Sequence, residues 1–118
     1  MDGGLNMGLD ITIYEKEPVI CPCCRAIVKY DTVDEAISSG KDWYDFLENI
    51  GYYIPYEKQS DKEAVNSWYG KDMELSLEQV TNMVKFVRQH KVYNYYEIEQ
   101  LVRNTKLEGH LIVINADW

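Results

Sequence analysis

The sequence predicts a single α+β domain, with a sheet of two to three strands packed by about four helices. Segments near both ends, 8–14 and 110–115, have the composition of strands, and the segments between them carry apolar residues at helical spacing. Strands at the two ends with helices between them favour an α+β fold, with the last strand beside the first and the helices on one side. The 118 residues fit one domain. We expect residues 1–6 to be a flexible leader and residues 7–118 to form that domain.

The first strand is predicted from strict alternation. In Gly8–Tyr14, Leu9, Ile11 and Ile13 alternate with polar or aromatic neighbours, which is the period of a strand with one buried face. The segment 15–18 (EKEP) then predicts a turn. Residues 26–30 again look extended, so the cysteines that precede them should lie at the tip of a hairpin or in a bend between strands.

Capping boxes and apolar spacing predict the helices. Thr32 and Glu35 form a capping box that predicts a short helix ending at Gly40. The next helix ends at Gly51 and places four apolar residues on one face at i, i+3, i+4 and i+7. These are Trp43, Phe46, Leu47 and Ile50.

The second half of the chain has one long loop, two helices and a strand. Residues 52–75 show no sustained period, and Pro55 with the polar run 57–63 predicts a loop. Ser76 begins a second capping box, for a helix to about His90, and Asn94 fits the same pattern for a further helix. The β-branched segment 110–115 predicts a strand buried on both faces.

The charge of the chain is concentrated in its middle third. Twelve acids against four bases give residues 31–78 a net charge of −8, while the segments before and after carry −1 and +1. Such a field repels nucleic-acid phosphates and attracts basic surfaces. No segment has the ~18 apolar residues of a membrane span. We therefore expect a protein partner with a basic surface, and no binding to nucleic acid or membrane; a solvated face that aids solubility is the alternative.

Aromatic residues lie among these acids. Eight aromatic residues fall between Trp43 and Tyr69, and the segment 52–56 cannot bury every ring because consecutive side chains diverge. Tyrosine offers a large contact area and a polar tip, which suits an interface. Packing of the loop onto its own domain is the alternative. The predicted binding residues are Tyr52, Tyr53, Tyr56, Glu57, Asp61, Glu63, Trp68 and Tyr69.

All three cysteines lie in the stretch VICPCCRAIV, at Cys21, Cys23 and Cys24. An odd, bunched set is no disulfide framework and indicates a reducing compartment. Cys21 and Cys24 have the spacing of half a zinc knuckle, but zinc needs four ligands and no second pair exists. A site completed by histidines or by another molecule, and a redox site, are the alternatives. We favour a tight turn with free thiols, and expect no cofactor, with zinc at Cys21 and Cys24 as the alternative.

The stretches MGLDITIY, CPCC, NIGYYIPYE and SWYGKDMELSLEQ resemble small uncharacterised proteins of phages and prophages. Relatives tend to carry CP-x-C followed by glycine, and Cys23 and Arg25 depart from that pattern. The resemblance implies a phage or mobile-element origin and no particular activity. It spans most of residues 7–80.

The sequence contains no catalytic signature, so we predict a non-enzymatic, acidic protein-binding module in the cytoplasm of a bacterial host. By analogy with small acidic phage proteins, it would inhibit a host nucleic-acid-binding defence effector, as anti-CRISPR proteins do. A small zinc- or thiol-containing protein and a structural or accessory phage protein are the alternatives. The sequence leaves the oligomeric state open.

Overall fold

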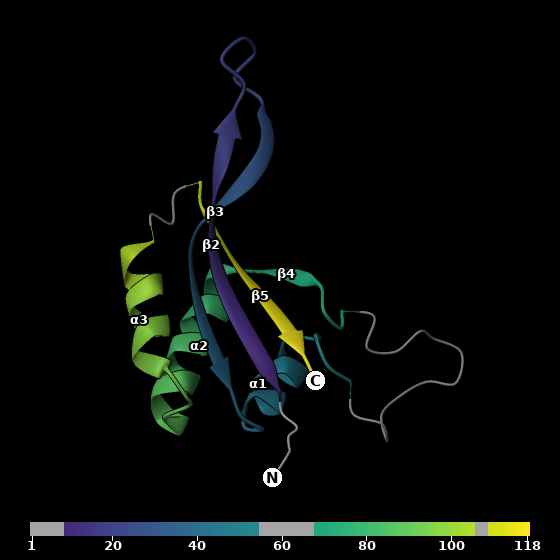
Figure 1. The fold of residues 1–118 in the computed structure, drawn as a ribbon, viewed down its shortest axis with the longest axis vertical. Coiled ribbons are helices and arrows are strands. Elements are labelled where there is room, and N and C mark those ends of the chain that lie inside the picture. The colour runs from purple at the N-terminus through teal and green to yellow at the C-terminus, as the bar shows by residue number, and fades with distance from the viewer. Residues whose placement is uncertain (1–8, 55–67, 106–108) are drawn as a thin grey trace, which may run out of the picture.

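The structure is a computed structural model that describes residues 9–54, 68–105 and 109–118. These residues form a four-stranded antiparallel sheet, in the order β3-β2-β5-β4, and three helices (Figure 1). The elements are β2 (Asp10–Ile20), β3 (Ile27–Ser39), α1 (Trp43–Asn49), β4 (Asp72–Leu75), α2 (Leu77–His90), α3 (Tyr95–Asn104) and β5 (Leu111–Asp117). The α+β class is confirmed. The predicted two to three strands and about four helices differ from the four strands and three helices that the described residues form.

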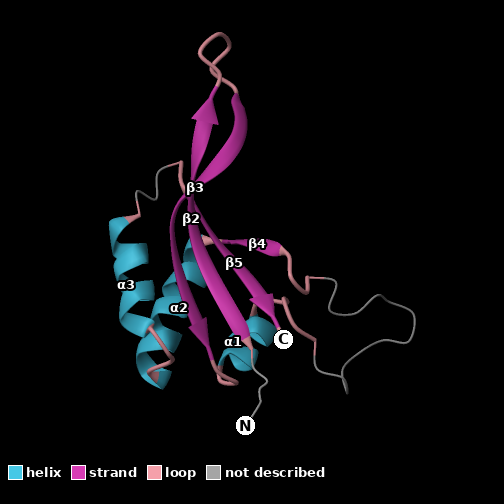
Figure 2. Cartoon of the chain, in the orientation of Figure 1, coloured by secondary structure: helices cyan, strands magenta, loops and turns pink. Residues whose placement is uncertain are grey.

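The centre of the sheet is the pairing of the first described strand with the last. The last strand lies beside the first, as the sequence predicted; β2 runs antiparallel to β5, with Ile13 opposite Ile114. The helices cover one face of the sheet (Figure 2), and the alternating isoleucines of β2 and β5 form the core beneath them. Val113 is also buried, on the face of β5 that points away from this core, whereas Leu111 and Asn115 on that face are partly exposed and Asp117 is exposed. The predicted burial on both faces therefore holds only at Val113.

β2 is longer than predicted, because residues 15–18 continue the strand in place of a turn. β2 pairs with β3 as far as Ile20, but its pairing with β5 ends at Lys16. Pro18 lies beyond that last pair, so its missing N–H does not cost β2 a hydrogen bond to β5. A register shift at Glu15 and Lys16 marks the place where the strand pair leaves the rest of the sheet.

β3 occupies the segment where the capping box predicted a short helix. Ala36 and Ser38 alternate into the core, and the buried Ser38 hydroxyl accepts a hydrogen bond from Trp43 Nε1 at 2.9 Å. The same hydroxyl donates to the carbonyl of Tyr93 at 2.5 Å. These tertiary bonds and the pairing with β2 override the local preference for a helix. The helix prediction for residues 32–40 is therefore wrong.

The other helices follow their sequence signals. α1 buries Trp43, Phe46 and Leu47 as predicted. α2 begins with the predicted capping box, in which Ser76 and Gln79 exchange two hydrogen bonds. Asn94 precedes α3 but makes no side-chain cap; its Nδ2 donates to the Ile37 carbonyl of β3 at 2.9 Å. The capping role predicted for Asn94 is therefore wrong, because its side chain bonds instead to the edge strand β3.

Candidate functional site

A cluster of aromatic rings gathers around Trp118 at the end of β5. The centroid of the Trp118 ring lies 4.7 Å from that of Tyr69, 5.3 Å from that of Tyr53 and 6.2 Å from that of Tyr52. The centroid of the Trp68 ring also lies 6.2 Å from that of Tyr52. Sequence reasoning missed Trp118, since one aromatic residue at the chain end gives no periodic signal. Strand pairing is what brings it to the predicted tyrosines.

Tyr52 lies inside this cluster and is fully buried. Its hydroxyl accepts a hydrogen bond from the Ala116 N–H at 2.8 Å and donates to the Lys71 carbonyl at 2.5 Å. Burial raises the pKa of this phenol, so the group stays protonated and keeps its donor. The prediction that Tyr52 contacts a partner is wrong, because its ring and hydroxyl join three segments of the fold from within.

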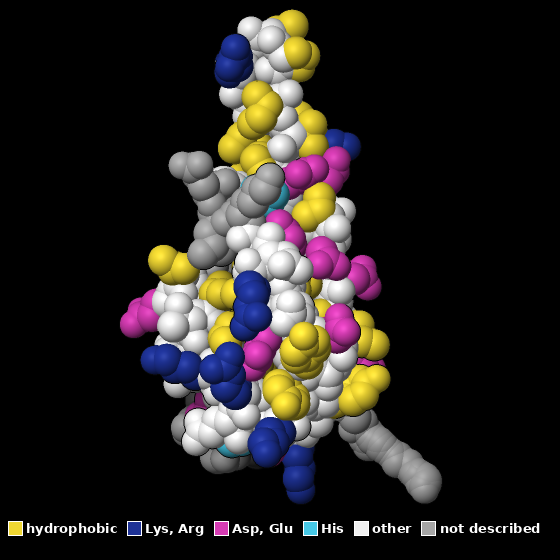
Figure 3. Space-filling view, turned by 90° about the vertical axis from the view of Figure 1, so that its left-hand side faces the viewer, with side chains coloured by type: hydrophobic (Ala, Val, Ile, Leu, Met, Phe, Trp, Pro, Cys, Tyr) yellow, Lys and Arg dark blue, Asp and Glu magenta, His cyan; other side chains and the backbone are white. Residues whose placement is uncertain are grey.

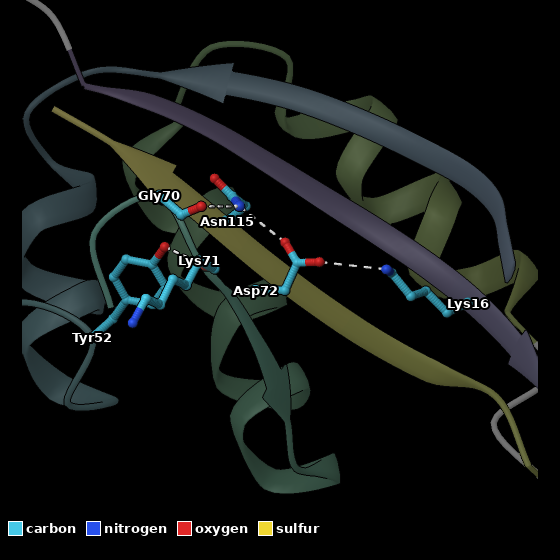
Figure 4. Close-up of polar contacts among 6 residues, drawn as sticks. All are labelled: Lys16, Tyr52, Gly70, Lys71, Asp72 and Asn115. Carbon is cyan, nitrogen blue, oxygen red and sulfur yellow. Dashed lines mark hydrogen bonds and ion pairs between the residues drawn. The ribbon is translucent and has the colours of Figure 1, made fainter. Parts of the chain in front are cut away.

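A second set of polar contacts fixes the chain just before β4 (Figure 4). Asn115 Nδ2 donates to the Gly70 carbonyl at 3.0 Å and to Asp72 Oδ1 at 2.9 Å, and Lys16 Nζ approaches Asp72 Oδ2 at 3.4 Å. These contacts join residues 70–72 to β5 and β2. Because Trp68 and Tyr69 directly precede this segment, their backbone is anchored where it meets the sheet.

Trp68 and Tyr69 are the predicted binding residues that the structure exposes. Their exposed fractions are 38% and 46%, while Tyr53 is half-buried. The Tyr69 hydroxyl donates to the Trp118 carbonyl at 2.9 Å, and hydrogen bonding to the neighbouring Asp117 raises its pKa. The predicted residues Tyr56, Glu57, Asp61 and Glu63 lie outside the described residues.

Two carboxylates border the exposed rings. Asp10 and Asp117 are opposite one another in the pairing of β2 with β5, and both are exposed. In the part of the chain that the structure describes, no lysine or arginine forms an ion pair with either of them. We define the aromatic–acidic surface as the set Tyr53, Trp68, Tyr69, Trp118, Asp10 and Asp117. The described acids of the segment 31–78 lie in or beside β3, α1, β4 and α2.

The cysteines form the tip of the hairpin of β2 and β3, as predicted. The turn is closed by hydrogen bonds from the Cys21 N–H to the Ala26 carbonyl at 2.8 Å and from the Arg25 N–H to the Cys21 carbonyl at 2.9 Å. Arg25 adopts φ +65°, a left-handed conformation that glycine takes up at lower cost than a residue with a Cβ atom. Hydrogen bonds from the backbone N–H groups of Cys24 and Cys23 lower the pKa of the Cys21 thiol.

Neither histidine lies with the cysteines. His110 Nδ1 is 2.8 Å from Glu15 Oε2, and the His90 ring packs on Phe86 with centroids 4.6 Å apart. Among the described residues no group of three or more His, Cys, Asp or Glu side chains is placed to hold a metal ion. These residues therefore form no Cys₂His₂ site within one chain.

The comparisons with known proteins give no relative for this chain. No protein-family model, curated protein or solved structure matches it. Of the helices described, none has the length and apolar character needed to cross a membrane.

Proposed function

We propose that this chain is a non-enzymatic protein-binding module that docks on a basic partner protein through the aromatic–acidic surface. The observation that carries the proposal is the placement of the exposed Trp68 and Tyr69 rings beside Asp10 and Asp117, two carboxylates without a basic partner in the described chain. Arginine can stack on aromatic rings and pair with carboxylates at the same time. The surface therefore suits an arginine-bearing segment of another protein.

The charge of the chain supports the same class of partner. Its net charge of −8 attracts a basic surface over a distance and raises the rate of encounter. A basic patch or stripe is the electrostatic footprint of a nucleic-acid-binding protein. An acidic module bound there would occupy the place of the phosphates. This supports our proposal of an inhibitor of a host nucleic-acid-binding defence effector, of phage or mobile-element origin and acting in the bacterial cytoplasm.

The rings and the carboxylates should contribute to different steps of binding. Exposed carboxylates at the rim of an interface mainly set the association rate, and this effect weakens as salt screens the charges. Aromatic side chains that become buried in the complex mainly set the dissociation rate. Trp68 and Tyr69 are held against Tyr52 and Trp118, so they lose little side-chain freedom on binding.

The test starts with affinity capture from bacterial lysate and continues with kinetics on the purified captured protein. The variant Asp10→Asn/Asp117→Asn should lower the association rate several-fold at low salt and little at high salt, and Trp68→Ala should raise the dissociation rate. The control Asp31→Asn/Asp34→Asn removes the same charge from β3 and should leave both rates near those of the wild type.

Equal effects of the two double variants would contradict docking at the aromatic–acidic surface and leave only a general effect of net charge. Binding that responds to neither salt nor Trp68→Ala would also contradict it. The exposed rings of Tyr93 and Tyr96, beside and within α3, would then be the next surface to test.

A further inference from the structure

The hairpin tip stands clear of the rest of the molecule. We define the hairpin arm as residues 17–31, the part of β2 and β3 beyond the last pair with β5, at Lys16 and Leu111. Ile20 lies four residue steps along the strand from Lys16, which places the tip roughly 13 Å beyond the sheet. The arm projects from one end of the fold (Figure 1), and every residue from 22 to 35 is exposed. Cys23 and Cys24 are exposed and Cys21 is half-buried, so another molecule can reach the tip.

The turn brings its three cysteines close together. Backbone N–H groups of Cys24 and Cys23 donate to the Cys21 sulfur, and the side chains of Cys24 and Cys23 both lie near it. The left-handed Arg25 and the two hydrogen bonds across the turn fix this arrangement. Backbone N–H groups that point at a sulfur orient it as a metal ligand. The tip is thus half of a tetrahedral thiol site, already folded.

One chain cannot complete this site with the residues described. Structural zinc takes four ligands, and all three cysteines of the sequence are in this turn. His110 is bound to Glu15, which lies six residues before Cys21 in β2, or about 20 Å back along the strand. Among the described residues no three such side chains, Cys23 included, are placed to share a metal ion. The two further ligands of a site at Cys21 and Cys24 would come from a second molecule.

The surroundings of the tip favour a second copy of this chain as that molecule. Ile20 and Ile27 face each other at the last pair of the arm and are 45% and 51% exposed, and Val28 beside them is 61% exposed. Figure 3 shows apolar side chains gathered on the arm, away from the body. Two tips that meet would cover these side chains around the metal and exclude water from it. Arg25 of each copy would bring positive charge to the anionic thiolate centre.

We propose that one zinc ion joins two copies of the chain, tip to tip, through Cys21 and Cys24 of each copy. Each of the four thiols releases its proton to solvent as it binds the metal, and no electrons are transferred. A symmetric pair supplies four sulfurs at about 2.3 Å in a closed tetrahedral site. Zinc removal should separate the copies and leave each folded, because the core lies in the sheet and helices, away from the tip.

Zinc-linked pairing does not depend on the proposed docking function, but it would affect docking. Joined tips leave the aromatic–acidic surfaces of both copies free, since these surfaces lie at the opposite end of β2 from the tip. The zinc-linked pair would then present two docking surfaces, which raises the apparent affinity for a partner with two sites.

The test titrates the reduced, metal-free full chain with zinc alone and follows mass by analytical ultracentrifugation. We expect one zinc ion per two chains and a rise from 13.8 kDa to twice that mass. EDTA should restore the monomer with an unchanged circular dichroism spectrum. Cys21→Ser and Cys24→Ser should stay monomeric in zinc, while the matched control Cys23→Ser should form the zinc-linked pair like the wild type.

Four results would overturn the inference. They are a monomeric mass at saturating zinc, one zinc ion per chain, a pair that survives EDTA but is dissolved by a reductant, and loss of pairing in Cys23→Ser equal to that in Cys21→Ser. Circular dichroism of each variant separates loss of the site from loss of the fold. None of these readouts depends on a partner protein, so failure here is distinct from failure of the docking proposal.

Discussion

The substitution Tyr52→Phe tests the way in which the core supports the aromatic–acidic surface. The ring stays in place, so the apolar burial of Tyr52 is unchanged and only the hydroxyl is lost. The Ala116 N–H then has no acceptor in a fully buried position. An unpaired buried donor costs roughly 1–3 kcal/mol. The Lys71 carbonyl also loses its donor, but Lys71 is exposed and water can replace that bond.

We therefore expect Tyr52→Phe to lower the free energy of unfolding by about 2 kcal/mol. For a domain of 118 residues this corresponds to a fall in Tm on the order of 8 °C. Urea denaturation followed by far-UV circular dichroism measures the free energy. Near-UV circular dichroism reports whether the packing of Trp118 against its neighbours loosens.

The matched control is Tyr96→Phe, which removes the same hydroxyl from an exposed ring of α3. It should change stability by less than about 0.5 kcal/mol, as surface substitutions usually do. If Tyr52→Phe costs no more than Tyr96→Phe, the Tyr52 hydroxyl does not hold β5 and the segment before β4 together. The anchoring of Trp68 and Tyr69 would then need another explanation.

Two further predictions concern packing and pH. Leu47 of α1 is fully buried, so Leu47→Ala should lower the free energy of unfolding by ~3 kcal/mol in urea denaturation. The same change at the exposed Leu77 should cost less than about 0.5 kcal/mol. Similar losses for the two variants would mean that α1 does not face the core. Arg88 Nε lies 2.9 Å from Glu99 Oε2 and, chiefly through this hydrogen bond, lowers the pKa of Glu99. A lowered folded pKa adds stability above the unfolded pKa, and this stability is lost as pH falls through the folded pKa. Glu99→Gln should therefore be less stable than the wild type at pH 7 and equal to it in strong acid, and a difference that is independent of pH would contradict this origin.

The sequence predicted most reliably the elements whose signals are local. The apolar spacing of Trp43, Phe46 and Leu47 requires one buried helix face in any fold that forms this helix, and the structure has it. The capping box at Ser76 depends only on residues three positions apart. The alternation before Tyr14 and the dense β-branched residues of β5 similarly predicted two strands that pair. The cysteines at a hairpin tip followed from extended residues on both sides of them.

The sequence predicted which kinds of residue form the candidate site, but not which individual residues belong to it. Trp68 and Tyr69 were named because aromatic residues among acids are typical of an interface, and both are exposed. Tyr52 was named on the same ground and is buried, since no pattern distinguishes a ring that faces outward from its neighbour that faces inward. Trp118 and Asp10 could not be found, because strand pairing is what brings the two ends of the chain to this place.

The sequence alone determined the α+β class, the helix faces and the cap of α2, because each depends on periodicity or on neighbours a few residues apart. Only the tertiary structure decided that residues 32–39 form a strand, that β4 exists, and that Asn94 bonds to the sheet. Each of these depends on hydrogen-bond partners tens of residues away, such as Tyr93 for Ser38 and β5 for β4. Contacts made by a partner strand outweigh the few tenths of a kcal/mol per residue by which local preferences differ.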